Sequence, residues 1–364
     1  MNILYITVRA DHGGGPGHVD ILINNINMDG QKHDIYVAGP QDKPYYSKWA
    51  VNTNVKGYFI LPHRKFNFLV LLKLIFFCKK NKIALIHSNG KGAGVYSRLI
   101  KLFIFKIKIV HTFNGVHVDK YGWFMKRIYF FYERIFDLLT NFYICVSKGE
   151  QDICIKNKLF HESKSTVVYN SIKTPVVSAE KPIELERCED KFILVTLSRF
   201  DFQKNMDYLF EIASTTIHDD SILYVLVGDG PDKERLEKLK LPNVIFTGFK
   251  NNPQDYLACS SLYISTARWE GLPFALVESC SLGIPIICTN VVGNNEVVNE
   301  GQNGYFFNSS NEAVALIRKI KNDTILLNTL KTNSLGVYNQ KFRIENMILK
   351  YNEVYHNLIS KNFS

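Results

Sequence analysis

Residues 192–214 read FILVTLSRFDFQKNMDYLFEIAS, and they give the clearest indication of the fold class. Phe192–Ser198 is a short apolar run typical of a buried strand, and Met206–Ser214 has the apolar spacing of an amphipathic helix. A polar loop joins the two segments. Repeated strand–loop–helix units of this kind favour a parallel sheet with helices on both of its faces.

The same unit recurs along both halves of the chain. We predict strands at Asn2–Val8, Ile35–Ala38, Ala84–His87, Ile107–Thr112 and Phe142–Val146, and then at Phe192–Ser198, Leu223–Gly228, Val244–Thr247, Leu262–Ser265 and Pro285–Thr289. Amphipathic segments such as Asp232–Lys238 lie between them. The pattern predicts α/β architecture with two doubly wound domains, in which ligands bind at the carboxyl ends of the strands.

A polar stretch separates the two series of strands. Lys173–Lys191 contains two prolines and a cluster of acidic residues, and a chain of 364 residues is long enough for two domains. We therefore predict an N-terminal domain at 1–172, a linker at 173–190 and a C-terminal domain at 191–340. The last helix, within 341–364, is expected to return to the first domain, and a cleft is expected between the two domains.

Several classes of protein are disfavoured by composition. The first residues predict a strand and lack a basic leader, and the apolar run Phe66–Cys78 is too short for a membrane span and contains Lys73. The seven cysteines show no paired spacing, which indicates free thiols in a reducing compartment. No cysteine or histidine pair has metal-ligand spacing, so we expect no metal, and the cytoplasm is the expected location.

Positive charge is concentrated in the first half of the chain. Residues 1–170 hold 24 Lys and Arg against 11 Asp and Glu, whereas residues 171–364 hold 20 against 23. In Lys65–Lys80 and Tyr121–Tyr132 the basic residues alternate with large apolar ones. This pattern is compatible with helices that dock on an anionic membrane and also with ordinary core helices. The segments are too apolar for a solvated phosphate track, so we expect no nucleic-acid partner.

Two carboxylates stand out in residues 268–279, which read RWEGLPFALVES. Glu270 and Glu278 have seven residues between them and bracket a Gly-Leu-Pro turn at the start of an apolar helix. Pro273 suits the first helical turn, where a missing N–H has no cost. The free amides of that turn favour phosphate or sugar hydroxyls.

Loops after other strands carry groups suited to phosphates. Residues 11–19 read DHGGGPGHV, which lets backbone amides approach an anion but matches neither a dinucleotide-binding fingerprint nor a Walker A loop. Arg199 and Lys204 follow a strand and could clamp a diphosphate, although a solvated basic loop has the same composition. Residues 228–231 (GDGP) indicate a turn, and the backbone of 247–250 (TGFK) could meet a nucleobase.

Taken in order, these motifs resemble the retaining GT-B glycosyltransferases, specifically the large family four that includes bacterial polysaccharide enzymes. The resemblance spans nearly the whole chain. It includes the segments GGGPGH (13–18), NSI (170–172), LSRFDFQKN (197–205), VGDGP (227–231), TGF (247–249), the Glu270/Glu278 pair, VGNNE (292–296) and GQNG (301–304). Each motif is degenerate alone, but their order and spacing together are specific.

The resemblance implies two Rossmann-like domains and a donor site without metal or cofactor. It assigns the donor diphosphate to Arg199, Lys204 and Gly15, and the nucleotide to Glu278, Phe249 and Lys250. It assigns the donor sugar to Glu270 together with the backbone of Gly271, Leu272, Pro273 and Phe274. The acceptor or phosphate loop is assigned to Gly14, Gly15 and His18. Two cations and helix-tip amides can neutralise a leaving diphosphate without a metal ion.

One segment departs from the family pattern. Residues 111–117 read HTFNGVH, and Asn114 replaces the first histidine of the family's HG-x-H segment. Asparagine can donate and accept a hydrogen bond but cannot titrate. The catalytic candidates are therefore Glu270, Asn114 and His117, and His117 could equally be a structural residue.

The resemblance implies transfer of a hexose or N-acetylhexosamine, with retention, from a nucleotide diphosphate sugar (UDP is favoured) to a polyprenyl diphosphate-linked saccharide. The expected setting is bacterial capsule or O-antigen synthesis, with the protein peripheral on the inner face of the plasma membrane. Alternatives are a sugar-nucleotide epimerase or phosphorylase on the same architecture, and a non-catalytic membrane-bound scaffold. The intact Arg199, Lys204, Glu270 and Glu278 speak against a scaffold.

Overall fold

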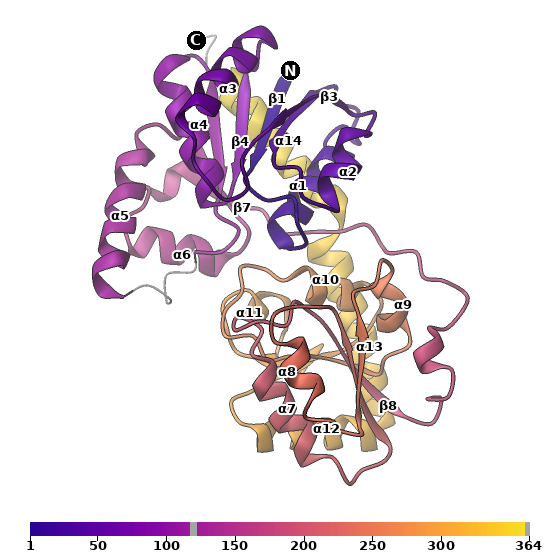
Figure 1. Cartoon of the computed structure of the whole chain (residues 1–364). Coiled ribbons are helices and arrows are strands. Elements are labelled where there is room, and N and C mark those ends of the chain that lie inside the picture. The colour runs from indigo at the N-terminus through magenta and orange to yellow at the C-terminus, as the bar shows by residue number, and fades with distance from the viewer. Residues whose placement is uncertain (117–121, 361–364) are drawn as a thin grey trace. The chain divides into compact units, whose positions relative to one another are not determined.

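The chain forms two compact units in a computed structural model that describes residues 1–116 and 122–360 (Figure 1). Unit 1 holds Met1–Asn170 together with the last helix from Ile344, and unit 2 holds Ser171–Arg343. The predicted linker 173–190 belongs to unit 2, where it includes a short 3-10 turn at Ile183–Leu185. The chain thus crosses between the units twice, next to Asn170 and next to Arg343.

Unit 1 is built on a parallel sheet of seven strands. These are β1 (Asn2–Thr7), β2 (Asp34–Gly39), β3 (Val55–Ile60), β4 (Leu85–Asn89), β5 (Lys108–Thr112), β6 (Phe142–Cys145) and β7 (Ser165–Val167). Their order in the sheet is β3-β2-β1-β4-β5-β6-β7. The order reverses between β1 and β4, and such a reversal opens a crevice at the carboxyl ends of the two strands.

Helices cover both faces of this sheet. They are α1 (Gly14–Asn25), α2 (Tyr45–Ala50), α3 (Phe68–Lys80), α4 (Lys91–Phe103), α5 (Trp123–Asp137), α6 (Lys148–Lys156) and α14 (Ile344–Ser360). Helices α1 and α14 pack on one face through residues such as Leu22 and Met347. Helices α3 and α4 pack on the other through residues such as Leu74 and Tyr96.

Unit 2 repeats the design with six parallel strands. These are β8 (Phe192–Leu197), β9 (Ile222–Val227), β10 (Val244–Gly248), β11 (Leu262–Ser265), β12 (Ile286–Thr289) and β13 (Gly304–Phe307), in the order β10-β9-β8-β11-β12-β13. The helices are α7 (Met206–Thr215), α8 (Lys233–Glu237), α9 (Pro253–Ala258), α10 (Phe274–Ser281), α11 (Asn294–Val297), α12 (Ser310–Asn322) and α13 (Thr324–Val337). The order reverses between β8 and β11.

The predicted α/β class with two doubly wound domains is confirmed. Three strands escaped the sequence analysis, namely β3, β7 and β13, and each lies at an edge of its sheet. Edge strands bury less side-chain surface: every residue of β7 is only partly buried, and Ile60 at the end of β3 is exposed. Their apolar signal is correspondingly weak.

The final helix returns to unit 1 and is held there by buried hydrogen bonds as well as apolar packing. The Tyr351 hydroxyl lies 2.8 Å from His18 Nε2, and the Tyr355 hydroxyl lies 2.6 Å from His87 Nδ1. His18 Nδ1 bonds to Asn170 Oδ1 at 2.8 Å. Burial lowers the pKa of His18 to about 4, against the opposing effect of the Asn170 bond, so the ring is neutral at pH 7 and uses both nitrogens.

Tyr351→Phe should therefore destabilise unit 1. The substitution leaves a buried acceptor on His18 without its donor, which typically costs about 1–3 kcal/mol. Differential scanning calorimetry should show a lower melting temperature for the transition that includes unit 1. The control is Tyr305→Phe, which removes a tyrosine hydroxyl from β13 in unit 2 and should leave the melting temperature of that transition unchanged. A Tyr351→Phe variant with native melting would contradict the role assigned to the bond.

Candidate functional site

Three of the residues predicted to bind the donor, Arg199, Lys204 and Glu270, gather where the strand order of unit 2 reverses. The chain leaves β8 into the loop with Arg199 and Lys204, and it leaves β11 into the loop with Glu270. Strands β8 and β11 are direct neighbours in the sheet. Two loops 66 residues apart in sequence are thus placed side by side at the position where open α/β sheets bind ligands.

Lys204 and Glu270 form an ion pair at the centre of this site. Lys204 Nζ lies 2.5 Å from Glu270 Oε1, and the two side chains are 23% and 8% exposed. Gln203 joins the same loops, because its Nε2 donates to the Trp269 carbonyl at 3.0 Å. The pair balances one positive and one negative charge in a half-buried site. A ligand with an anionic group for Lys204 and hydroxyl groups for Glu270 could replace the contact between the two side chains.

Arg199 is held by Asp201, a residue that the sequence analysis missed. Arg199 Nε donates to Asp201 Oδ2 at 2.7 Å, and the backbone amide of Lys204 donates to Asp201 Oδ1 at 3.2 Å. Asp201 therefore shapes the loop that carries both cations. The signal was present in the sequence, since an aspartate that precedes a helix start by a few residues commonly bonds to backbone amides just downstream.

Helix α10 begins directly after the Glu270 loop. Gly271, Leu272 and Pro273 are buried, and Phe274 is the first helical residue. Pro273 is the N-cap residue with φ −75° and ψ 124°, one position before the first turn in which we predicted it. The consequence is unchanged, because the first amides of α10 have no partner within the helix itself.

Gly293 explains why the VGNNE segment is part of the motif set. Gly293 has φ +89°, and a Cβ atom placed on it would lie 2.5 Å from the Gly271 carbonyl oxygen and 3.2 Å from Glu270 Cβ. A larger residue would push the loop that carries Glu270. Gly293 thus supports the site by its lack of a side chain.

Glu278 lies on the second turn of α10. Part of its side chain is exposed, but its carboxyl group is buried deeply enough that burial raises its pKa to about 7. Nearby, the fully buried Tyr263 bonds through its hydroxyl to the Leu197 carbonyl at 3.2 Å. Glu278 can accept two hydroxyl donors, and such bonds would favour its ionised form.

Phe249 and Lys250 lie at the carboxyl end of β10, at the edge of the same sheet. Phe249 is 48% exposed. Lys250 Nζ lies 2.5 Å from Glu184 Oε1, and the Tyr256 hydroxyl donates to the other oxygen of Glu184 at 2.8 Å. The bonds to Glu184 and Tyr256 raise the pKa of Lys250. Its charge is therefore engaged by the 173–190 segment, and the structure does not bring it to the Lys204–Glu270 pair.

Unit 1 has its own cluster at the reversal between β1 and β4. Helix α1 starts inside the glycine run, so the amides of Gly14 and Gly15 belong to its first turn. Asn114 Nδ2 donates to Asn89 Oδ1 at 3.5 Å, and a Cβ atom on Gly15 would lie 4.0 Å from the same Asn114 nitrogen. Asn89, at the end of β4, was missed, because nothing local distinguishes it from an ordinary strand-end residue.

The two predicted histidines have different outcomes. His18 is fully buried, and both of its ring nitrogens bond to protein groups, so its placement contradicts the predicted contact with an acceptor or phosphate. The ring faces the sheet and α14 because it lies on the inner side of α1. His117 lies outside the described residues. Within residues 1–116 and 122–360, the structure brings no three His, Cys, Asp or Glu side chains together as a metal site.

Two doubly wound parallel domains with a donor-type site in the second define the GT-B class of glycosyltransferase. Family comparison agrees: a model described as glycosyl transferases group 1 matches residues 177–336, and one described as glycosyltransferase family 4 matches residues 12–175. Together they span most of the chain, and the chain belongs to glycosyltransferase family 4.

The chain is also similar to individual proteins. The chain is 25% identical over 312 residues (79% of each protein) to an Escherichia coli UDP-Gal:alpha-D-GlcNAc-diphosphoundecaprenol alpha-1,3-galactosyltransferase. It is 26% identical over 368 residues (97% of this chain, 98% of the relative) to the E. coli O-antigen biosynthesis glycosyltransferase WbnH. The crystal structure of Anabaena HepE with UDP superposes with a TM-score of 0.82 at 18% identity, covering 98% of this chain and all of HepE.

The raised pKa of Glu278 predicts that the charged carboxylate lowers the stability of the fold, although a charged carboxylate is the better hydrogen-bond acceptor for a ligand. Folding raises this pKa from 4.5 to about 7, so the ionised carboxylate destabilises the ligand-free fold above pH 7, and the penalty disappears as pH falls toward 4.5. Glu278→Gln should melt at a higher temperature than the native protein at pH 8 and at nearly the same temperature at pH 5.

The resemblance predicts that Glu278 accepts nucleotide hydroxyls. On that prediction, we expect the same variant to bind UDP about tenfold or more weakly at pH 8, because an amide replaces a charged acceptor. Native affinity should itself fall as pH drops below 7. Isothermal titration calorimetry measures both effects. Equal melting temperatures of the native protein and the variant at pH 8 would contradict the raised pKa of Glu278. A native UDP affinity that does not change with pH near 7 would contradict the predicted role of Glu278 in nucleotide binding.

Proposed function

We propose that the chain is a retaining glycosyltransferase that moves a hexose or N-acetylhexosamine from a UDP-sugar to a saccharide linked to a polyprenyl diphosphate. The proposal places it in bacterial O-antigen or capsule synthesis. The names of the E. coli relatives support this setting, since one uses UDP-Gal and acts on a diphosphoundecaprenol-linked sugar. Donor and acceptor identities are inferred at the level of these chemical classes.

The Lys204–Glu270 pair is the observation that carries the proposal. A nucleotide diphosphate sugar presents a dianionic diphosphate next to a polyhydroxylated ring. Lys204 and Arg199 supply two cations for the diphosphate. Glu270, whose Oε1 lies 2.5 Å from Lys204 Nζ, supplies an acceptor for the sugar hydroxyls. The first amides of α10 add a positive partial charge beside them.

In the proposed reaction the C1–O bond to the diphosphate breaks and a bond forms between C1 and the acceptor oxygen. Arg199, Lys204 and the α10 amides stabilise the negative charge that develops on the leaving diphosphate. The acceptor oxygen bonds to C1 on the face from which the diphosphate leaves, which gives retention, and its proton passes to an oxygen of the leaving diphosphate. Glu270 orients the transferred sugar. In unit 1, the Asn114 amide is assigned to a substrate hydroxyl.

No metal ion or cofactor is invoked. The charge balance rests on the two cations and the helix amides, which can neutralise a leaving diphosphate without a metal. Glu278 is assigned to the ribose hydroxyls. A glycosyl-enzyme intermediate in the manner of retaining hydrolases needs two carboxyl groups about 5 Å apart around the bond, and we do not assign Glu278 that role.

Glu270→Ala should abolish sugar transfer while the protein stays folded. The variant loses the acceptor for the sugar hydroxyls and frees Lys204, so we expect turnover to fall at least about a hundredfold. Transfer of labelled sugar from UDP-sugars to a lipid-linked acceptor measures the effect, and circular dichroism checks the fold. Glu234→Ala, which deletes an exposed carboxylate on α8, is the control. Near-native turnover in Glu270→Ala would overturn the assignment.

We further propose that unit 1 docks on an anionic membrane through helices α3 and α5. Within the described residues, no helix is long and apolar enough to cross a membrane. Helix α3 nonetheless exposes Phe68, Leu69 and Phe76, at 57%, 68% and 69% of their surface. Helix α5 exposes Trp123 and Phe124 to a similar degree.

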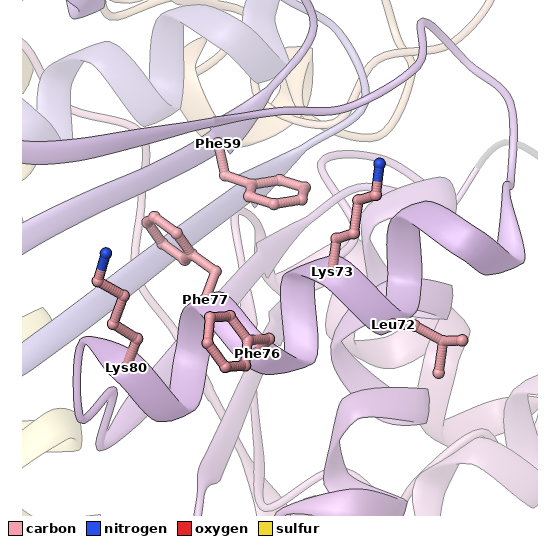
Figure 2. A pocket seen from close by; sticks show the side chains of 6 residues that line it. All are labelled: Phe59, Leu72, Lys73, Phe76, Phe77 and Lys80. Carbon is pink, nitrogen blue, oxygen red and sulfur yellow. The ribbon is translucent and has the colours of Figure 1, made fainter.

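The charges around these apolar residues fit anionic lipid. A hollow of about 520 Å³ between β3 and α3 is lined by Phe59, Leu72, Lys73, Phe76, Phe77 and Lys80 (Figure 2). Its rings could accommodate acyl groups while Lys73 and Lys80 meet phosphates. Helix α5 has two acidic residues. Glu133 is buried against Arg98 at 2.9 Å and Asp137 pairs with Lys164 at 2.9 Å, so both negative charges are balanced within the protein.

Charge reversal on α3 should therefore weaken membrane binding. The double variant Lys73→Glu/Lys80→Glu should bind vesicles containing phosphatidylglycerol at least about tenfold more weakly, because each lysine contributes on the order of 1 kcal/mol near such a surface. Vesicle flotation at low and high salt measures this. Lys331→Glu/Lys341→Glu, which changes as many charges in unit 2, is the control. Native protein that ignores anionic vesicles at low salt would rule out docking.

A further inference from the structure

Glu150 is a buried carboxylate that neither the motifs nor the proposed chemistry uses. It lies on the first turn of α6, after the N-cap residue Ser147, and it is 1% exposed. Ser147 Oγ accepts from the Glu150 amide at 3.1 Å, which is the first half of a capping box. In an ordinary capping box the glutamate side chain returns to the N-cap amide.

Here the carboxylate bonds elsewhere. Oε2 accepts from the amide of Val146 at 2.8 Å, one residue before the N-cap. Oε1 accepts from the amide of Gly115, which is 35 residues earlier in the chain. One side chain thus joins the end of β6 to the turn that follows β5. Such charge-assisted bonds are about twice as strong as neutral ones.

The turn that Glu150 holds has an uncommon backbone at Asn114, because residues other than glycine rarely adopt a positive φ. Asn114 has φ +56° and Gly115 has φ +103°, so two successive residues adopt left-handed conformations. A conformation of this kind persists when surrounding contacts determine it. The Glu150–Gly115 bond is such a contact, and it acts on the residue next to Asn114.

The turn also determines where the Asn114 amide points. Its Nδ2 lies 3.5 Å from Asn89 Oδ1 and faces Gly15 at the start of α1. A helix cap alone would not require full burial of a carboxylate, which is costly without bonds to both oxygens. The second oxygen of Glu150 is bonded to the turn, and this bond accounts for the burial.

We propose that Glu150 is a positioning residue for sugar transfer, which locks the Asn114–Gly115 turn so that the Asn114 amide meets a substrate hydroxyl. This inference rests on the proposed function, in which Asn114 contacts such a hydroxyl. Glu150 acts on the turn through its bond to the Gly115 amide. Small displacements of a positioned group can lower turnover by up to about a hundredfold, so a loosened turn should affect kcat more than donor KM.

The first test compares two variants of the same helix start. Glu150→Gln keeps one acceptor and removes the charge, and it should lower kcat about tenfold with donor KM within about threefold. Ser147→Ala removes the cap of α6, at a cost of about 1 kcal/mol, and should keep kcat within about twofold. Equal losses of kcat in the two variants at matched melting temperature would overturn the inference.

A double-mutant cycle tests whether Glu150 acts through Asn114. Asn114→Gly removes the amide and keeps the left-handed backbone accessible. In that background Glu150→Gln should lower kcat by less than about twofold, because coupled residues are not additive. A full tenfold loss there, or an Asn114→Gly variant with native turnover, would show that Glu150 does not act through this amide.

Hydrogen exchange separates failure of this inference from failure of the proposed function. Exchange of the Gly115 amide should be at least about tenfold faster in Glu150→Gln than in the native protein or Ser147→Ala. If the native protein transfers no sugar, the proposed function fails, but exchange still decides whether the carboxylate locks the turn. Unchanged exchange in Glu150→Gln would overturn the inference whatever the activity.

Discussion

The ion pair between Lys204 and Glu270 is the interaction around which the donor site of unit 2 is arranged. It joins the loops that leave β8 and β11, the two strands where the sheet order reverses. Asp201 shapes one loop, and the absent side chain of Gly293 leaves room for the other. The pair also balances one positive and one negative charge within the site. In the proposed reaction, a diphosphate sugar would replace this one internal contact with two contacts of its own.

The same topological device appears in unit 1 with different chemistry. There the reversal between β1 and β4 brings together the glycine-rich start of α1, Asn89 and Asn114, and none of these carries a charge. Such a surface suits neutral hydroxyl groups. Beside these residues Arg9 and Asp11 pair with each other at 2.7 Å, and further positive charge in unit 1 lies on helices such as α3, where lysines flank exposed aromatic rings. The two units thus divide the proposed work between diphosphate chemistry and contacts with a sugar and a membrane.

The sequence predicted the fold well because parallel strands buried on both faces give long apolar runs. Its failures have a common cause in edge strands, since β3, β7 and β13 each have a sheet neighbour on only one side. In the site, Arg199, Lys204 and Glu270 could be found because they stand in ordered motifs. Asn89 and Glu150 could not, because their partners are 25 and 35 residues away and only the folded sheet brings them together. The predicted role of His18 was wrong because a position next to a glycine loop does not indicate on which side of α1 the imidazole ring lies.

The most direct test of the central claim is the anomeric configuration of the product formed from an α-linked UDP-sugar and a polyprenyl diphosphate-linked saccharide. Proton NMR of the purified product distinguishes the two anomers through the coupling between H1 and H2. A retaining transferase with the site described above gives an α-glycoside, and this coupling is then small for a gluco- or galacto-configured sugar. A β-glycoside, or release of free sugar without any glycoside under conditions that saturate the acceptor, would contradict the account.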